Sequence, residues 1–188
     1  MLDRDQISPE SVRPLRRSEY DRLVQWGVFG DEQLELLYGT IVAMSPIGTA
    51  HAESVRRLLR LFSSLIDRVE VQIQLPLAAS HESEPQPDVS LVPRGDYLAD
   101  HPSKALLVIE VADTSLKKDR LVKAPLYASA GIPEYWIVNL IDDVIEVHRS
   151  PSRGKYREVT RHGRGEVLRP LQFADLAVRV DDVLPPRK

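Results

Sequence analysis

Two apolar runs in the middle of the chain each carry one carboxylate. The first run, residues 89–92, directly follows Pro87-Asp88, and the second run, residues 105–111, contains Glu110. Short apolar runs of this kind predict buried strands. Because removing an ionised carboxylate from water is costly, a buried one is expected to be ion-paired, hydrogen-bonded or bound to a metal. The sequence therefore predicts a sheet with a chemical function at Asp88 and Glu110.

The segment between the two runs predicts how these carboxylates face each other. Residues 95–104 are typical of a connection centred near residue 99 or 100, so the two strands are expected to be antiparallel, with Asp88 and Glu110 as cross-strand neighbours. If the side chains share a face, their Cβ atoms lie about 5 Å apart. Two carboxylates this close repel each other, which raises the pKa of at least one, and a divalent cation relieves the repulsion.

Composition narrows the class of protein. The 188 residues are 43% hydrophobic and 28% charged, which is typical of one globular domain, expected at residues 15–184 after an N-terminal extension at 1–14. The net charge of −3 argues against a protein that coats nucleic acid through bulk positive charge, so any contact with nucleic acid must be local.

The lack of cysteine excludes a disulfide framework, a thiolate zinc site and a cysteine nucleophile, and it fits a reducing cytoplasm. The N-terminus has no signal-peptide pattern, and no apolar run approaches the roughly 18–20 residues that a bilayer requires. We therefore expect a cytoplasmic protein.

The order of the expected elements indicates the fold class. The expected helices are residues 19–26, 50–66 and 119–130, and the expected strands are 34–37, 40–44, 69–75, 87–93, 105–112, 134–139, 144–149 and 155–160. Tyr38-Gly39 is the turn of a hairpin between the first two strands. The inner stripe of the long helix is expected to be Ala52, Val55, Leu59, Phe62 and Ile66. This order predicts an α+β fold with a mixed β-sheet flanked by helices, and not a doubly wound sheet.

A series of short motifs runs along these elements. The motifs are Leu34-Glu35-Leu36, Gly39, Met44-Ser45-Pro46, Gly48, His51-Ala52, Pro87-Asp88-Val89, Glu110-Val111, Ser115, Asp119, Lys123, Tyr127 and Gly131-Ile132-Pro133-Glu134-Tyr135-Trp136-Ile137-Val138. Each is weak alone, but the ordered set, from about residue 15 to 184, resembles the Uma-two family of restriction endonucleases, within the PD-(D/E)XK nuclease superfamily. The resemblance implies a restriction-endonuclease-like core.

The resemblance also implies roles for individual residues. In such nucleases the carboxylates of the two core strands, here Asp88 and Glu110, bind Mg²⁺, for which Mn²⁺ substitutes. A lysine two residues after the second acid acts on the attacking water, but that position is Ala112 here. In the Uma-two family a lysine on the following helix takes this role, and Lys123 is the matching residue. By superfamily analogy the backbone carbonyl of Val111 is a third metal ligand.

The sequence leaves the choice of lysine open. Lys117 and Lys118 lie nearer to the second carboxylate and are alternatives to Lys123. Asp119 lies four residues before Lys123, so an exposed helix pair worth about 0.3–0.5 kcal/mol would explain both residues without catalysis. Pro125 cannot donate to a helix ladder, which predicts a helix that begins just after Lys123.

Other residues have both a functional and a structural interpretation. Glu35 matches an acid of the family's N-terminal motif and is expected to reach the site or to hold a water of the metal. His51 is either a partly buried structural histidine or a contact to a phosphate or metal-bound water, and Tyr127 either packs in the core or faces the site. Asp88 itself could merely solvate the start of a strand. A basic cluster, which is either a solvated surface or a phosphate contact, consists of Arg149, Arg153, Lys155, Arg157, Arg161 and Arg164.

These residues predict a Mg²⁺-dependent endonuclease that hydrolyses DNA phosphodiester bonds. Carboxylate-bound Mg²⁺ activates water and balances the charge of the phosphate. Cutting a duplex needs two active sites, so a homodimer is expected. One alternative is a catalytically inactive nucleic-acid-binding or assembly module of the same fold. Another is a hydrolase of a different phosphate ester, which would need an enclosed pocket.

Overall fold

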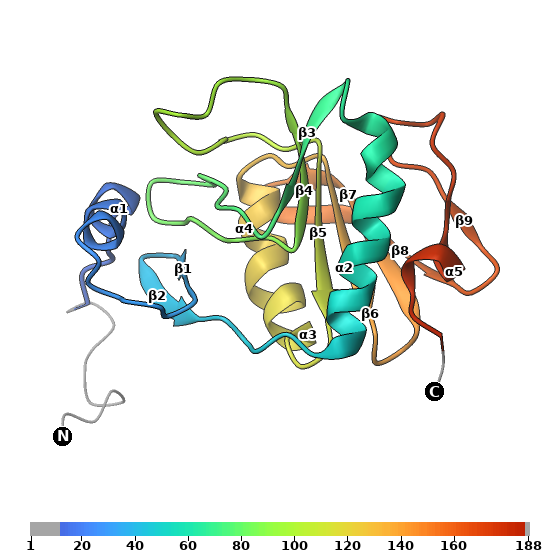
Figure 1. Ribbon diagram of the computed structural model, residues 1–188, viewed down its shortest axis with the longest axis horizontal. Coiled ribbons are helices and arrows are strands. Elements are labelled where there is room, and N and C mark those ends of the chain that lie inside the picture. Colours follow the sequence, from blue (N-terminus) through green and yellow to red (C-terminus); the bar gives the residue numbers. More distant parts are fainter. Residues whose placement is uncertain (1–11, 187–188) are drawn as a thin grey trace.

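Six strands form one mixed sheet at the centre of the protein (Figure 1). The computed structural model describes residues 12–186. Neighbouring strands are antiparallel throughout this sheet except for β5 and β6, which are parallel. In their order across the sheet, the strands are β3 (Val69–Ile73), β4 (Val89–Pro93), β5 (Leu107–Ala112), β6 (Glu134–Asn139), β7 (Val144–Ser152) and β8 (Lys155–Gly163). The predicted α+β fold with a mixed sheet is confirmed.

The pairing of β4 with β5 brings the two carboxylates of the apolar runs together. The strands are antiparallel, and Val89 pairs with Ile109. One step further along the same register, Asp88 lies opposite Glu110. The geometry expected from the connection at residues 95–104 is therefore observed.

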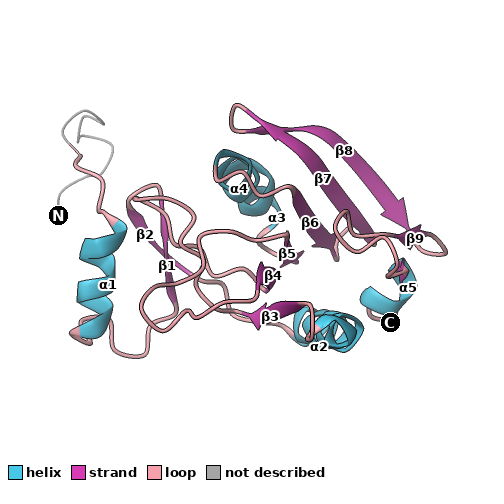
Figure 2. Ribbon diagram, turned by 90° about the horizontal axis from the view of Figure 1, so that it is seen from above, coloured by secondary structure: helices cyan, strands magenta, loops and turns pink. Residues whose placement is uncertain are grey.

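Helices cover both faces of the sheet (Figure 2). On one face, α2 (Thr49–Phe62) shares a core with Ile109 and Val111 of β5. On the other face, α4 (Ala124–Ser129) shares a core with Val108 and Ala112. Because side chains alternate along a strand, Glu110 lies on the α4 face.

The buried stripe of α2 differs from the expected one. Leu59 and Ile66 are 43% and 59% exposed, so their predicted place in the inner stripe was wrong. Their neighbours Leu58 and Leu65 are buried instead, together with Val55 and Phe62. The helix ends at Phe62 and continues as the 3₁₀ turn η3 (Ser63–Leu65), which keeps Leu65 on the buried face.

The N-terminal elements lie to one side of the sheet (Figure 1). They are α1 (Arg17–Gln25), β1 (Leu34–Leu37) and β2 (Thr40–Ala43). β1 and β2 form the expected hairpin, in which Tyr38 and Gly39 have φ angles of +50° and +72°. A Cβ atom at Gly39 would lie 2.3 Å from Cβ of Pro14, so this turn requires glycine.

One helical segment carries the candidate lysines. It consists of α3 (Leu116–Lys118), the π-helical turn η4 (Asp119–Lys123) and α4. The regular α-helix α4 begins at Ala124, directly after Lys123, as predicted, and the π-helical turn before it makes the helical segment continuous through Lys123. Pro125 has no N–H for the ladder, and the turn immediately before α4 adopts the wider π geometry. Gly131, at φ +74°, follows the segment as expected.

The C-terminal elements were not predicted. They are β9 (Val167–Leu168), β10 (Val178–Arg179) and α5 (Val180–Val183), and they pack against the α2 face of the sheet. The division into an extension at 1–14 and a domain at 15–184 stays a prediction, and residues 1–11 lie outside the described part. No helix within residues 12–186 is both long and apolar enough to cross a bilayer.

Candidate active site

A cleft opens at the edge of the sheet where β4 begins and β5 ends. Its volume is about 150 Å³. Asp88 and Glu110 line it from the strands, Glu35 lines it from β1, His51 from α2, and Lys123 from the helical segment. These five side chains lie far apart in the sequence but meet in one cleft. The sequence had suggested each of them as a candidate site residue.

Asp88 is held in a fixed orientation by three partners. Its Oδ2 accepts a hydrogen bond from the backbone N–H of Val111 at 2.8 Å. Its Oδ1 lies 2.8 Å from Nε2 of His51 and 3.2 Å from Nε2 of Gln74. Burial works against the charged carboxylate, but these hydrogen bonds outweigh it and keep the pKa of Asp88 below its usual value. Asp88 is therefore an ionised carboxylate that faces the end of β5 and does not merely solvate a strand.

Glu110 lies in a drier environment. Its Oε1 accepts hydrogen bonds from Nζ of Lys123 at 2.9 Å and from the hydroxyl of Tyr127 at 2.7 Å. Burial raises the pKa of Glu110 to about 8 despite the charge of Lys123, and the nearby carboxylates add to the rise. The direction is the one expected for one of two converging acids, and burial contributes more to it than repulsion between the carboxylates.

Lys123 is the lysine that reaches the second carboxylate. Its Nζ also lies 3.0 Å from Oε2 of Glu35. Burial disfavours the ammonium, but the carboxylates around it raise its pKa, so Lys123 remains charged. Lys118 contacts Oε1 of Glu35 at 2.9 Å, whereas Lys117 is exposed. The alternative of an exposed pair between Asp119 and Lys123 was wrong, because these residues are 1% and 3% exposed.

Glu35 is a fully buried carboxylate between two lysines. Burial would raise its pKa, but the charges of Lys123 and Lys118 outweigh this effect and lower the pKa. The backbone N–H of Gln86 also points at Oε2 of Glu35, at 3.4 Å. His51 has a half-buried ring that contacts Asp88. Tyr127 is buried and faces the site, because its hydroxyl donates to Glu110.

Gln74 is the contact of the site that the sequence did not suggest. It follows β3, whose last residue, Ile73, pairs with Val89, so Gln74 lies opposite Asp88. Its φ angle of +51° marks the point where the strand leaves the sheet. The register between residues 69–75 and 87–93 is the signal that would have found it.

The basic cluster does not line this cleft. Three of its arginines are bound to carboxylates: Arg149 to Glu134, Arg161 to Asp142, and Arg164 to Asp143 and Asp181. These pairs give three of the six residues a structural role, and a phosphate contact stays a prediction for the exposed residues Arg153, Lys155 and Arg157.

The oxygen atoms at the cleft suit a hard divalent cation. Among residues 12–186, no hydrogen bond or ion pair reaches Oε2 of Glu110, which lines the cleft together with Asp88. The described part of the chain holds no group of three or more His, Asp or Glu side chains arranged for a metal. Two carboxylates nevertheless match Mg²⁺, which is commonly held by one or two carboxylates and several waters.

The mixed sheet, with two carboxylates at one edge and a lysine from the covering helix, defines a restriction-endonuclease-like fold. A family model named Uma2, described as "Putative restriction endonuclease", matches residues 17–181. The chain belongs to this family, which supports nuclease chemistry as the general class.

One solved structure has a similar fold over most of its length. A protein from Anabaena variabilis ATCC 29413, described as "a putative nuclease belonging to DUF820", is 16% identical with a TM-score of 0.71, and the match covers 90% of this chain and 97% of that chain. The type IIG restriction endonuclease BpuSI is also 16% identical, with a TM-score of 0.40 over 61% of this chain and 14% of that chain. No curated protein matches this chain.

Proposed function

We propose that this protein is a Mg²⁺-dependent endonuclease that hydrolyses phosphodiester bonds in DNA. The observation that carries the proposal is the contact of Lys123 with Glu110 in the cleft that Asp88 also lines. Family membership supports the nuclease class, and the description of the family as restriction endonucleases supports DNA as the substrate.

Asp88 and Glu110 would hold the metal. The hydrogen bonds from Val111 and His51 keep Asp88 ionised and fixed, while Oε2 of Glu110 is left for a further partner. When bound, Mg²⁺ lowers the pKa of a water and offsets the negative charge that develops on the phosphate. Mn²⁺ should occupy the same oxygen ligands, and the carbonyl of Val111, whose N–H binds Asp88, is the proposed third ligand.

Lys123 would supply a fixed positive charge. Its raised pKa keeps the ammonium protonated, so we assign it to binding a phosphate oxygen and orienting the attacking water, and not to accepting a proton. Glu35 and Tyr127 position this machinery, since Glu35 contacts Lys123 and the hydroxyl of Tyr127 holds the same oxygen of Glu110 as the lysine does.

The size of the cleft favours a polymer over a small phosphate ester. Sites that enclose a small ligand usually measure about 300–1,000 Å³. The cleft, at about 150 Å³, has room for a phosphate and its waters but not for a whole small substrate. Cutting both strands of a duplex takes two such sites, so the proposal includes a homodimer. The cytoplasm is the proposed location, supported by the lack of cysteine.

The test combines metal binding with cleavage. Calorimetry with Mn²⁺ should show binding to the wild type, and the binding should be lost in Asp88→Asn. A pool of duplex DNAs of varied sequence should be cut in the presence of Mg²⁺ or Mn²⁺ and left intact in EDTA. A wild type that binds no metal and cuts none of these DNAs would contradict the proposal and favour the inactive binding module.

A further inference from the structure

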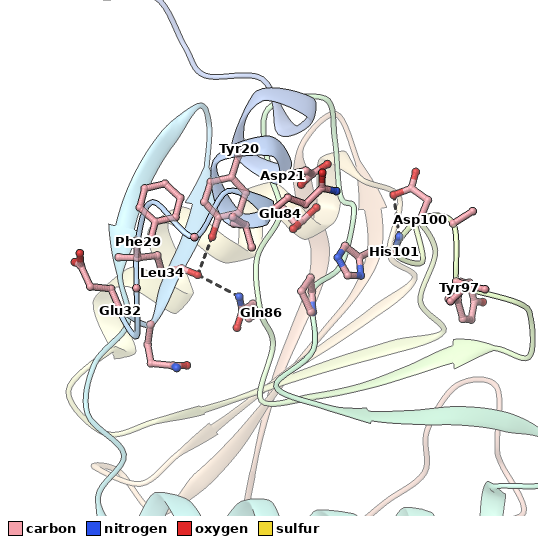
Figure 3. A pocket seen from close by; sticks show the side chains of 18 residues that line it. Tyr20, Asp21, Phe29, Glu32, Leu34, Glu84, Gln86, Tyr97, Asp100 and His101 are labelled. Atoms are coloured by element: carbon pink, nitrogen blue, oxygen red, sulfur yellow. Dashed lines mark hydrogen bonds between the residues drawn. The ribbon is translucent and has the colours of Figure 1, made fainter.

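A second, larger cavity shares Gln86 with the candidate active site. Figure 3 shows the side chains that line this cavity. Its volume is about 430 Å³. It lies between α1, the segment that leads into β1, the chain at residues 84–86 and the loop at residues 97–101. None of the roles assigned above to the catalytic residues uses this cavity.

Aromatic rings form part of its wall. Tyr20 and Phe29 stack on each other with ring centroids 5.8 Å apart and an interplanar angle of 29°. The hydroxyl of Tyr20 donates to the backbone carbonyl of Leu34 at 3.0 Å, which fixes the ring. Tyr97 lines the cavity at the other end of the labelled group (Figure 3). Tyr20 is only 3% exposed and supports Phe29 from behind, so the partly exposed rings of Phe29 and Tyr97 are the faces on which a nucleobase of any sequence can stack.

The remaining wall is rich in hydrogen-bond acceptors. Asp21, Glu84 and Asp100 line the cavity and converge on a single guanidinium, since Arg17 lies 3.6, 3.5 and 2.6 Å from them. One positive charge for three carboxylates leaves an excess of acceptors. Burial, followed by the charge of Asp21, raises the pKa of Glu84 to about 7. The cavity therefore suits a ligand with N–H donors and repels phosphate.

One residue joins this cavity to the catalytic cleft. Gln86 lines both spaces. Its side-chain Nε2 donates to the carbonyl of Leu34, which lines the cavity, at 3.1 Å, and its backbone N–H points at Glu35, which lines the cleft. Leu34 and Glu35 are consecutive residues of β1, so this strand separates the two spaces.

We propose that this cavity takes adenine or cytosine, the nucleobases with an amino group at purine C6 or pyrimidine C4, extruded from the strand whose phosphate occupies the catalytic cleft. The inference rests on the proposed nuclease function. Enzymes that act on a strand can extrude a base into a neighbouring pocket, and carboxylates accept hydrogen bonds from its amino group. Guanine, thymine and uracil present a carbonyl at the equivalent position, which the carboxylates of the wall repel.

The test measures nucleoside binding without cleavage. Saturation-transfer NMR on the full-length protein in EDTA compares adenosine with purine riboside, which lacks only the amino group, and cytidine with uridine. We expect adenosine and cytidine to bind saturably at millimolar concentration and the other two to bind at least about tenfold more weakly.

Matched variants assign the binding to the cavity. Asp21→Asn should weaken adenosine binding about tenfold, whereas Asp31→Asn, an exposed carboxylate of the same region outside the cavity, should leave it unchanged. Three outcomes would overturn the proposal. Either no nucleoside binds, or the two nucleosides of each compared pair bind equally, or the two variants change adenosine binding equally. Tighter binding of spermidine than of adenosine would also overturn it and would indicate a site for a cation.

The two proposals fail separately. The nucleoside experiment contains no divalent metal, so adenosine binding by a protein that cuts no DNA would contradict only the nuclease proposal. DNA cleavage by a protein that binds no nucleoside would contradict only the base pocket. Lys123→Met should bind adenosine as the wild type does, because Lys123 does not line the cavity.

Discussion

Nζ of Lys123 lies 2.9 Å from Oε1 of Glu110, and both side chains are buried. The acid comes from a central strand and the lysine from the helix that covers it. A strand lysine two residues after the acid, as in most of the superfamily, is replaced here by Ala112, which is fully buried. The positive charge therefore reaches the site across the interface between helix and sheet.

Lys123→Met should reduce DNA cleavage by about 10²–10³-fold, the usual cost of removing one group that stabilises charge in the transition state. Methionine keeps most of the volume of the lysine. Glu110 loses its cation and Glu35 keeps only Lys118, so the variant should also be less stable, by up to about 3–5 kcal/mol, which urea denaturation measures.

The matched control for this variant is Lys117→Met, which changes an exposed lysine of the same helical segment. It should cut DNA as the wild type does. If the two variants cut DNA equally well, Lys123 is not the catalytic lysine. Lys118 would then be the nearest candidate.

Mn²⁺ binding at pH 7 should release a proton. Because burial raises the pKa of Glu110 to about 8, its carboxyl is largely protonated at neutral pH, and a bound divalent ion favours the ionised form. Calorimetry in buffers of different ionisation enthalpy counts the protons released. The count should fall towards zero as the pH rises above about 9, and a count of zero at pH 7 would contradict metal binding at Glu110.

In the absence of metal, Glu110→Gln should change how stability depends on pH. Between its usual pKa of 4.5 and about 8, Glu110 keeps its proton in the folded protein and loses it in the unfolded chain. Its contribution to the free energy of unfolding therefore falls as the pH rises through this window, with each unit of difference in pKa worth about 1.4 kcal/mol.

Denaturation with urea at a series of pH values should show this slope in the wild type and a weaker slope in Glu110→Gln. Glu32→Gln removes an exposed carboxylate and should keep the wild-type slope. A slope that is as steep in Glu110→Gln as in the wild type would mean that another group causes it.

Gly39→Ala should destabilise the hairpin that carries Glu35. The glycine has φ +72°, and a Cβ atom there would meet Cβ of Pro14 at 2.3 Å. Gly30→Ala is the control, because Gly30 also has a positive φ, +54°, but a Cβ atom there meets nothing within 4 Å. The control should lose only the roughly 1–2 kcal/mol of the backbone conformation, and Gly39→Ala should lose more. Equal losses in thermal denaturation would show that contact with Pro14 has no effect.

The central part of the site could be predicted from the sequence because the residues that form it lie close together along the chain. Asp88 and Glu110 border adjacent strands joined by a short connection, so the centre of that connection determined which residues face each other. The choice among three lysines needed the tertiary structure, since Lys117, Lys118 and Lys123 differ in the direction in which the helix presents them. Gln74 was missed because its role depends on the register of a third strand.

The parts of the fold that the sequence did not predict share a physical cause. On α2, apolar residues occur in adjacent pairs, such as Leu58 with Leu59, so two stripes fit the helical period equally well and packing decides between them. β9, β10 and α5 contain two to four residues each. Elements this short carry no periodic signal and form only because Val178, Val180 and Val183 are buried against the core.

The π-helical turn at Asp119–Lys123 determines which lysines can share one carboxylate. Lys118 and Lys123 are five residues apart, and in a regular α-helix, at 3.6 residues per turn, they would point about 140° away from each other. In this protein they bind the two oxygens of Glu35, at 2.9 and 3.0 Å. A π turn joins residues five apart, which places both ammonium groups on one side of the segment. If the same residues adopted the regular α-helical pitch, one of the two cations would rotate out of the site, so the π turn is itself a component of the site's geometry.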